Sequence, residues 1–121
     1  MTDPSRKPFV LTPPGAWSPS PIAPEKLLSG APNPHIDHRY SDDRQQFHCG
    51  YWQSDVGRWK IHYTETEWCL LLSGQIELID DEGFSLPVHA GQSFLIPSGF
   101  KGQWVTHEAC VKLYVIYEPT P

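Results

Sequence analysis

The sequence predicts an all-β protein, a barrel or sandwich of short strands that follows an extended proline-rich arm. Nine of the 13 prolines lie within residues 1–34, and proline suits neither a helix interior nor a central strand. From residue 47 onward, short segments rich in valine, isoleucine, leucine and aromatic residues alternate with glycine or proline, which is typical of evenly spaced strands. No segment after residue 46 has the apolar periodicity of a helix.

Residues 1–45 are expected to run as an extended arm with one helical turn. Pro24 can begin that turn and Gly30 can end it. Apolar residues such as Phe9 make the segment more hydrophobic than an ordinary disordered tail. We therefore expect the arm to pack on the barrel, taken as residues 46–121, or on a partner subunit. The alternative is a mobile leader.

The barrel is expected to contain several short strands. The expected strands cover residues 47–53, 58–64, 67–73, 75–80, 84–88, 93–96, 103–107 and 111–117. An acidic hairpin turn at residues 80–83 is expected because Gly83 can adopt the positive φ that such a turn requires. The pattern alone is compatible with both a jelly roll and an immunoglobulin-like sandwich.

Composition argues against several classes of function. At 121 residues the chain is long enough for one domain, and its net charge of -5 without a cluster of Lys or Arg argues against nucleic-acid binding. It has no apolar run of membrane-spanning length and no apolar signal segment, so we expect a cytoplasmic protein without membrane contact. The three cysteines are widely spaced among apolar residues, which favours buried reduced thiols.

Two glycine-cornered motifs resemble the paired motifs of a cupin barrel. The first covers residues 57–74 with Glu67 near its middle, and the second covers residues 91–99. Three shorter segments make the resemblance more specific: residues 63–69, 97–104 and 112–116. They resemble the single-domain cupins that are related to the cupin domain of ureidoglycine aminohydrolase. The resemblance implies that the barrel is a jelly roll, the cupin double-stranded β-helix. The activity does not follow from the fold, because one fold hosts many chemistries.

The resemblance also implies a metal held by one Glu, two His and one Gln. Carried over to this chain, those positions hold Ile61, Tyr63, Glu67 and Gln103. Ile has no donor atom and Tyr is a rare ligand, so the sequence favours a pocket without a metal or other cofactor. Strand alternation points Ile61 and Tyr63 inward and His62 outward. The opposite register stays open, with His62, Glu67 and Gln103 converging on a divalent Zn, Mn or Ni ion. His35 and His38 stand three residues apart in the arm, which on a flexible segment is a weak signal for a site. His48, His89 and His107 are isolated and are expected at surface or satisfied positions.

Glu67 is the candidate catalytic residue. A carboxylate inside the barrel calls for a cationic partner, and Lys112 is the candidate by analogy with the family. Strand alternation places Lys112 and Tyr114 on one face. The candidate ligand-binding residues are Tyr63, Gln103, Trp104, Lys112 and Tyr114. The alternative is a structural Glu67, solvated at the mouth of its strand.

Three functions follow as expectations. The first is binding of a small polar nitrogen compound, such as an amine, amino acid or ureide, with Glu67 serving as general base if the protein is an enzyme. The second is a non-catalytic accessory module with a barrel filled by Tyr63, Phe94 and Trp104. The third is a metal-dependent enzyme resembling an aminohydrolase. A hollow barrel with convergent polar groups would favour the first over the second.

The sequence also predicts a homodimer. Leu70 and Leu72 have the opposite parity from Glu67, Cys69 and Leu71, so this strand is apolar on both faces. A strand buried on both faces needs a cover outside the barrel, either the arm or a second subunit. Because small cupins commonly pair as dimers, we expect a homodimer with the arm at its interface.

Overall fold

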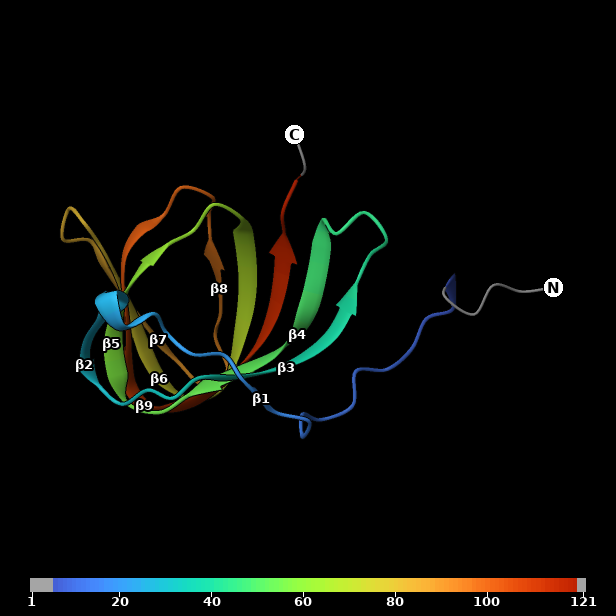
Figure 1. Ribbon diagram of the computed structural model, residues 1–121, viewed down its shortest axis with the longest axis horizontal. Helices are drawn as coiled ribbons and strands as arrows, with labels where there is room; N and C mark the ends of the chain where they lie inside the picture. Colours follow the sequence, from blue (N-terminus) through green and yellow to red (C-terminus); the bar gives the residue numbers. More distant parts are fainter. Residues whose placement is uncertain (1–5, 120–121) are drawn as a thin grey trace.

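Two long strands, β6 (Thr66–Asp80) and β9 (Lys101–Tyr117), pair along most of their length and form the spine of the fold. The computed structural model describes residues 6–119 and confirms the predicted all-β jelly-roll barrel (Figure 1). The other elements are β1 (Ser18–Pro19), the 3-10 helix η2 (Pro24–Lys26), β2 (Leu27–Gly30), β3 (His35–Ser41), β4 (Phe47–Ser54), β5 (Gly57–His62), β7 (Ser85–His89) and β8 (Ser93–Ile96). No helix within the described residues has the length and apolar character needed to cross a membrane.

The two halves of the spine belong to two parts of one curled antiparallel sheet. The first half of β6 pairs with β8 and with the second half of β9, from which the sheet continues through β4 and β3 to β1. The second half of β6 pairs with β7 and with the first half of β9, from which the sheet continues through β5 to β2. Figure 1 shows the strands curling around a common interior.

β6 bends where its register with β9 shifts, between Leu71 and Ile76. Gly74 lies at this bend with a φ of +88°, and a Cβ added there would come within 2.3 Å of the carbonyl oxygen of Ala109. Both the positive φ and the close backbone approach require glycine. Bulges of this kind turn a strand while keeping its pairing on either side.

Two pairs of predicted strands are therefore continuous in the structure. The strands predicted at 67–73 and 75–80 are the two halves of β6. Those predicted at 103–107 and 111–117 are parts of β9. The sequence marks a bend in the same way as it marks a strand end, because glycine serves at both places.

The predicted arm contributes three strands to the sheet. Residues 8–17 run as an extended segment outside regular structure, whereas β1, β2 and β3 pair within the sheet (Figure 1). β3 and β4 form a hairpin across the expected boundary between residues 45 and 46, so the chain shows no break at that point. The expected helical turn is η2, after which the chain continues as β2 to Gly30. Residues 1–5 of the expected arm lie outside the described residues.

Asp37 on β3 holds the extended segment against the sheet. Its carboxylate accepts hydrogen bonds from the backbone N–H groups of Gly15 and Ala16, at 3.0 and 3.2 Å. Arg39 donates to both carboxylate oxygens at 3.0 Å and also to the carbonyl oxygen of Pro13 at 3.0 Å. The hydrogen bonds from Arg39, followed by that from Gly15, lower the pKa of Asp37 from 3.8 to about 2.

Acid should release this segment over a defined pH range. Because the folded pKa of Asp37 lies below the unfolded value, its stabilising effect is complete above pH 3.8 and is lost as the pH falls through about 2. Asp37→Asn should reproduce the release at neutral pH as faster chymotryptic cleavage after Trp17. Asp43→Asn, at an exposed position, is the matched control. Equal cleavage rates for the two variants would contradict the role given to Asp37.

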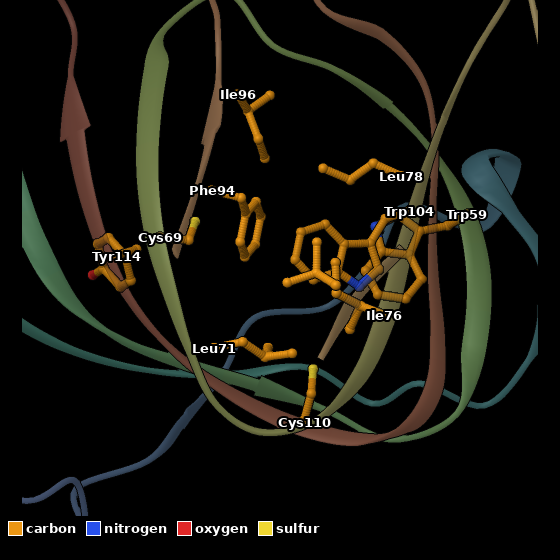
Figure 2. Packing of buried hydrophobic residues seen from close by; sticks show 11 residues of the cluster. Trp59, Cys69, Leu71, Ile76, Leu78, Phe94, Ile96, Trp104, Cys110 and Tyr114 are labelled. Atoms are coloured by element: carbon orange, nitrogen blue, oxygen red, sulfur yellow. The ribbon is translucent and has the colours of Figure 1, made fainter. Parts of the chain in front are cut away.

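The apolar core is built from both parts of the sheet. Trp59 of β5 and Trp104 of β9 stack with ring centroids 6.2 Å apart, and the ring of Phe94 on β8 lies 6.2 Å from that of Trp104. Figure 2 shows these rings pointing into the barrel, with Leu71 and Cys110 below them in the view. Packing of this density fixes the orientation of Trp104. The same ring forms part of a cavity wall.

Candidate functional site

A cavity of about 350 Å³ opens inside the barrel beside the core. Side chains from β3, β4, β5, β6 and β9 line it. Among the lining residues are Trp52, Trp59, Tyr63, Glu67, Trp104 and Lys112. Tyr63 and Trp104 form walls around open space, whereas the accessory-module alternative expects them to fill the barrel.

Strand register explains why the polar residues reach this cavity. Glu67 on β6 lies opposite Ile116 of β9, and Leu71 lies opposite Lys112. Residues in register on neighbouring strands point to the same face of a sheet. Lys112, Tyr114 and Ile116 alternate with outward-facing positions, so all three share the inner face with Glu67.

Lys112 and Glu67 form a buried ion pair in the cavity wall. The Nζ atom of Lys112 lies 2.9 Å from Oε2 of Glu67, and each residue is 4% exposed. The thiol of Cys69 donates to the same oxygen at 3.3 Å, and Tyr63 is close enough to Glu67 for the carboxylate to add to burial in raising the pKa of its phenol. Lys112 therefore supplies the cationic partner that a buried carboxylate requires.

Burial and charge together determine the protonation of this wall. Burial on its own lowers the pKa of Lys112, but the neighbouring Cys69 and Glu67 hold that pKa well above its ordinary value. Burial raises the pKa of the Cys69 thiol to about 12, and it raises the pKa of Tyr63 well above its ordinary value. The wall therefore contains the Lys112–Glu67 ion pair and two neutral groups, the phenol of Tyr63 and the thiol of Cys69, so these four side chains have no net charge.

The ammonium of Lys112 also lies against two indole rings. Its Nζ atom is 4.5 Å from the ring centroid of Trp104 and 4.8 Å from that of Trp52. The faces of these rings attract a cation, most strongly where water is excluded. The chain's own lysine thus occupies the aromatic cage that could otherwise hold the ammonium group of a ligand.

A chain of hydrogen bonds runs along the cavity to its mouth. The hydroxyl of Tyr114 lies 2.6 Å from Nδ1 of His38, and Oγ of Ser41 lies 2.7 Å from both Nε2 of His38 and Nδ1 of His48. Both histidines line the cavity. Sequence reasoning missed them, although alternation in the predicted strand 47–53 places His48 on the same face as the cavity-lining Trp52. For His38 only the weak signal of its spacing from His35 was available, because β3 was not predicted.

Gln103 lies outside the cavity. It precedes Trp104 on β9, and adjacent residues of a strand point to opposite faces. Trp104 lines the cavity, so the side chain of Gln103 belongs to the outer face, where its Oε1 atom is buried without a hydrogen-bond partner. His62 is exposed on β5. His62, Glu67 and Gln103 therefore do not converge.

The residues at the cupin ligand positions do not fit a divalent metal. Ile61 has no side-chain atom that can coordinate a metal, and Tyr63 is a neutral phenol. Glu67 already forms an ion pair with Lys112. Zinc sites need three or four protein ligands with deprotonated donors. Within residues 6–119, no group of three or more His, Cys, Asp or Glu side chains is arranged to hold a metal ion.

The fold is similar to several solved structures, whereas no curated protein sequence matches the chain. The EutQ protein of Clostridium difficile aligns with a TM-score of 0.65 at 16% identity, over 82% of this chain and 81% of that chain. A protein of unknown function from Pseudomonas syringae pv. tomato aligns with a TM-score of 0.77 at 22% identity, over 84% of this chain and 44% of that chain. Ectoine synthase from P. lautus aligns with a TM-score of 0.64 at 14% identity, over 79% of this chain and 71% of that chain. Identities this low show the shared fold alone.

The sequence itself shows the family. Residues 42–114 match the EutQ-like cupin domain, which is more than half of the chain. The matched segment includes β4 to β8 and most of β9, and with them both ends of the ion pair. The narrower resemblance to ureidoglycine aminohydrolase is not confirmed by these matches. The chain belongs to the family of EutQ-like cupin domains.

Proposed function

We propose that the cavity binds a small neutral nitrogen compound of the amide or ureide class. The observation that carries this proposal is the ion pair of Lys112 and Glu67 within a wall that is otherwise made of aromatic side chains and isoleucines. Because the two charges neutralise each other, a ligand with a net charge meets no unpaired opposite charge. A planar amide offers a carbonyl oxygen to Lys112 and a flat face to the indole rings.

Amines and amino acids are the other ligands considered from the sequence, and they fit this wall less well. A ligand ammonium near Glu67 would also lie near the ammonium of Lys112, and like charges repel strongly where water is excluded. An amino acid could pair its two ends with Lys112 and Glu67, but only by separating the existing ion pair. A neutral amide requires neither change.

The ion pair also favours binding over general-base catalysis by Glu67. Proton transfer to Glu67 would leave the ammonium of Lys112 buried without its counter-charge. An uncompensated buried charge costs several kcal/mol. The proposal is therefore a binding protein, with catalysis by Glu67 as the alternative.

Calorimetric titration with 2-imidazolidinone, a planar cyclic urea, should detect binding, and n-butylamine and acetate should bind at least about tenfold more weakly. Trp52→Leu should weaken urea binding about three- to tenfold, because one aromatic face of the wall is lost. Phe84→Leu, at a position that is 62% exposed outside the cavity, is the matched control. Tighter binding of the amine would contradict the proposal, and NMR detection of a urea hydrolysis product would favour the catalytic alternative.

We also propose that two copies associate through the outer face of the sheet formed by β4, β6, β8 and β9. Leu95, Trp68 and Val115 lie in register across β8, β6 and β9, and Tyr117 pairs with Phe47 on the same side. Leu95 is 57% exposed and Tyr117 is 52% exposed. An uncharged sheet face of this kind can meet its own copy about a two-fold axis, which is the commonest arrangement of oligomers.

Sedimentation should therefore give a dimer for the full chain and a monomer for Leu95→Arg, which places a charge on this outer face beside Trp68. Val56→Arg adds the same charge at a position that is 55% exposed in the turn between β4 and β5. That control should remain dimeric. A monomeric unmodified protein, or equal effects of the two substitutions, would count against this interface.

A further inference from the structure

The hydrogen bonds at the cavity mouth have only one consistent direction when both histidines are neutral. Nε2 of His48 lies 3.2 Å from the carbonyl oxygen of Gln45 and 3.7 Å from Oε2 of Glu118. Both oxygens only accept, so Nε2 of His48 carries the hydrogen. Nδ1 of a neutral His48 is then a bare acceptor, and the neighbouring hydroxyl of Ser41 must donate to it.

The same reasoning continues inward to the cavity. Because Ser41 has a single hydroxyl hydrogen, its oxygen must accept from Nε2–H of His38. Nδ1 of His38 is then bare and accepts from the hydroxyl of Tyr114. Tyr114 therefore gives its only hydrogen to His38, and its oxygen keeps lone pairs that can accept from a ligand in the cavity.

We propose that His38, Ser41 and His48 set the hydrogen-bonding direction of Tyr114 toward the ligand. With His48 neutral, Tyr114 accepts a hydrogen bond and selects a ligand that carries an N–H group. With His48 protonated, the chain reverses and Tyr114 becomes a donor. This inference rests on the proposed function, which it deepens by naming the ligand group that the cavity mouth recognises.

One added proton is enough to reverse every bond. A protonated His48 donates from Nδ1 to Ser41, which frees the hydroxyl hydrogen of Ser41 to donate to Nε2 of His38. His38 remains neutral but moves its hydrogen to Nδ1, from which it donates to the oxygen of Tyr114. The hydroxyl hydrogen of Tyr114 is then free to point toward the ligand.

The surrounding charges direct that proton to His48. Burial and the neighbouring His48 both lower the pKa of His38. Burial raises the pKa of Tyr114, which keeps its phenol neutral. The charged groups that face the chain are Glu118 and Asp42 at His48, and the Glu67–Lys112 pair and Asp37 at Tyr114. The carboxylates of Glu118 and Asp42 lie on the side of His48, whereas His38 faces the phenol of Tyr114, so the proposal places the added proton on His48.

Histidine tautomers provide a test that needs no ligand. Long-range proton–nitrogen NMR spectra of the full chain, titrated from about pH 8 to 5, should show both His38 and His48 as Nε2–H tautomers at the alkaline end. As His48 becomes an imidazolium, His38 should change to the Nδ1–H tautomer while staying neutral. His107, which pairs with Glu77 on the outer face, is the internal control and should titrate independently. An Nδ1–H tautomer of His38 at the alkaline end, or no change of His38 when His48 is protonated, would overturn the proposal.

Ser41 is the link that the coupling requires. Ser41→Ala should leave both histidines titrating without a tautomer change at His38, and Ser41→Thr should restore the change because it keeps the hydroxyl. Circular dichroism checks that both variants fold. Persistence of the coupled change in Ser41→Ala would contradict the role of Ser41.

A pair of ligands then tests the consequence for recognition. At about pH 8, 2-imidazolidinone should bind about tenfold more tightly than its 1,3-dimethyl derivative, which has no N–H group. At about pH 5 the preference should fall to about threefold or less, and Ser41→Ala should remove this dependence on pH. Correct tautomers without binding of either urea would contradict the proposed function and the recognition role together, leaving only the tautomer coupling. Binding with the wrong tautomers would overturn this inference and leave the proposed function standing.

Discussion

Replacing Lys112 by methionine should lower the free energy of unfolding by about 3–5 kcal/mol. The substitution keeps most of the side-chain volume but removes the ammonium that lies 2.9 Å from Glu67. Both residues are 4% exposed, so water cannot replace the lost partner. The carboxylate would keep its hydrogen bond from Cys69, which does not neutralise its charge.

Removing both charges separates the cost of an unpaired carboxylate from that of a changed shape. The double variant Lys112→Met with Glu67→Leu should recover most of the lost stability, because a buried ion pair contributes little more than an apolar pair of similar volume. Lys101→Met, at an exposed position on the same strand, should change stability by about 0.5 kcal/mol or less. Thermal unfolding of the four proteins, followed by circular dichroism in the absence of urea, measures all these differences. A double variant as unstable as Lys112→Met would show that packing, and not charge, sets the effect.

The predicted fold agrees with the structure because the barrel depends on local signals. Alternation along short strands identifies the inner face, and glycines at corners such as Gly74 are visible in the sequence. The same signals do not tell a bend from an end, so β6 and β9 were each predicted as two strands. β3 was missed because it follows a proline-rich segment, although its own residues from His35 to Ser41 contain no proline.

The candidate site could be predicted in part for the same reason. Alternation placed Lys112 and Tyr114 on one face, and the structure brings both to the cavity with Glu67. Gln103 was predicted from the family resemblance, without testing its position by strand alternation. Because Gln103 and Trp104 are adjacent on one strand, their side chains point to opposite faces and cannot both line the cavity. His38 comes from β3, so its approach to Tyr114 depends on tertiary pairing that no local pattern shows.

Truncating Trp104 to alanine should have an effect as large as the loss of Lys112, about 3–5 kcal/mol in the free energy of unfolding. Trp104 is 1% exposed, and its indole N–H donates to the hydroxyl of Thr106 at 2.9 Å. Its removal would leave a void between Trp59 and Phe94, whose rings both lie 6.2 Å away. The void would join the existing cavity, so water could enter the core.

Two further substitutions separate the core role of Trp104 from its role in the cavity wall. Trp104→Phe keeps an aromatic face for Lys112 and the ligand but loses the hydrogen bond to Thr106, so it should cost less than Trp104→Ala. Phe84→Ala truncates an aromatic side chain that is 62% exposed and should cost about 0.5 kcal/mol or less. Binding of 2-imidazolidinone is then measured at temperatures where both variants are folded. If Trp104→Phe keeps this binding and Trp104→Ala loses it, the indole acts on the ligand through its aromatic face. Equal loss in both variants would instead place the effect in the hydrogen bond to Thr106, which orients the ring.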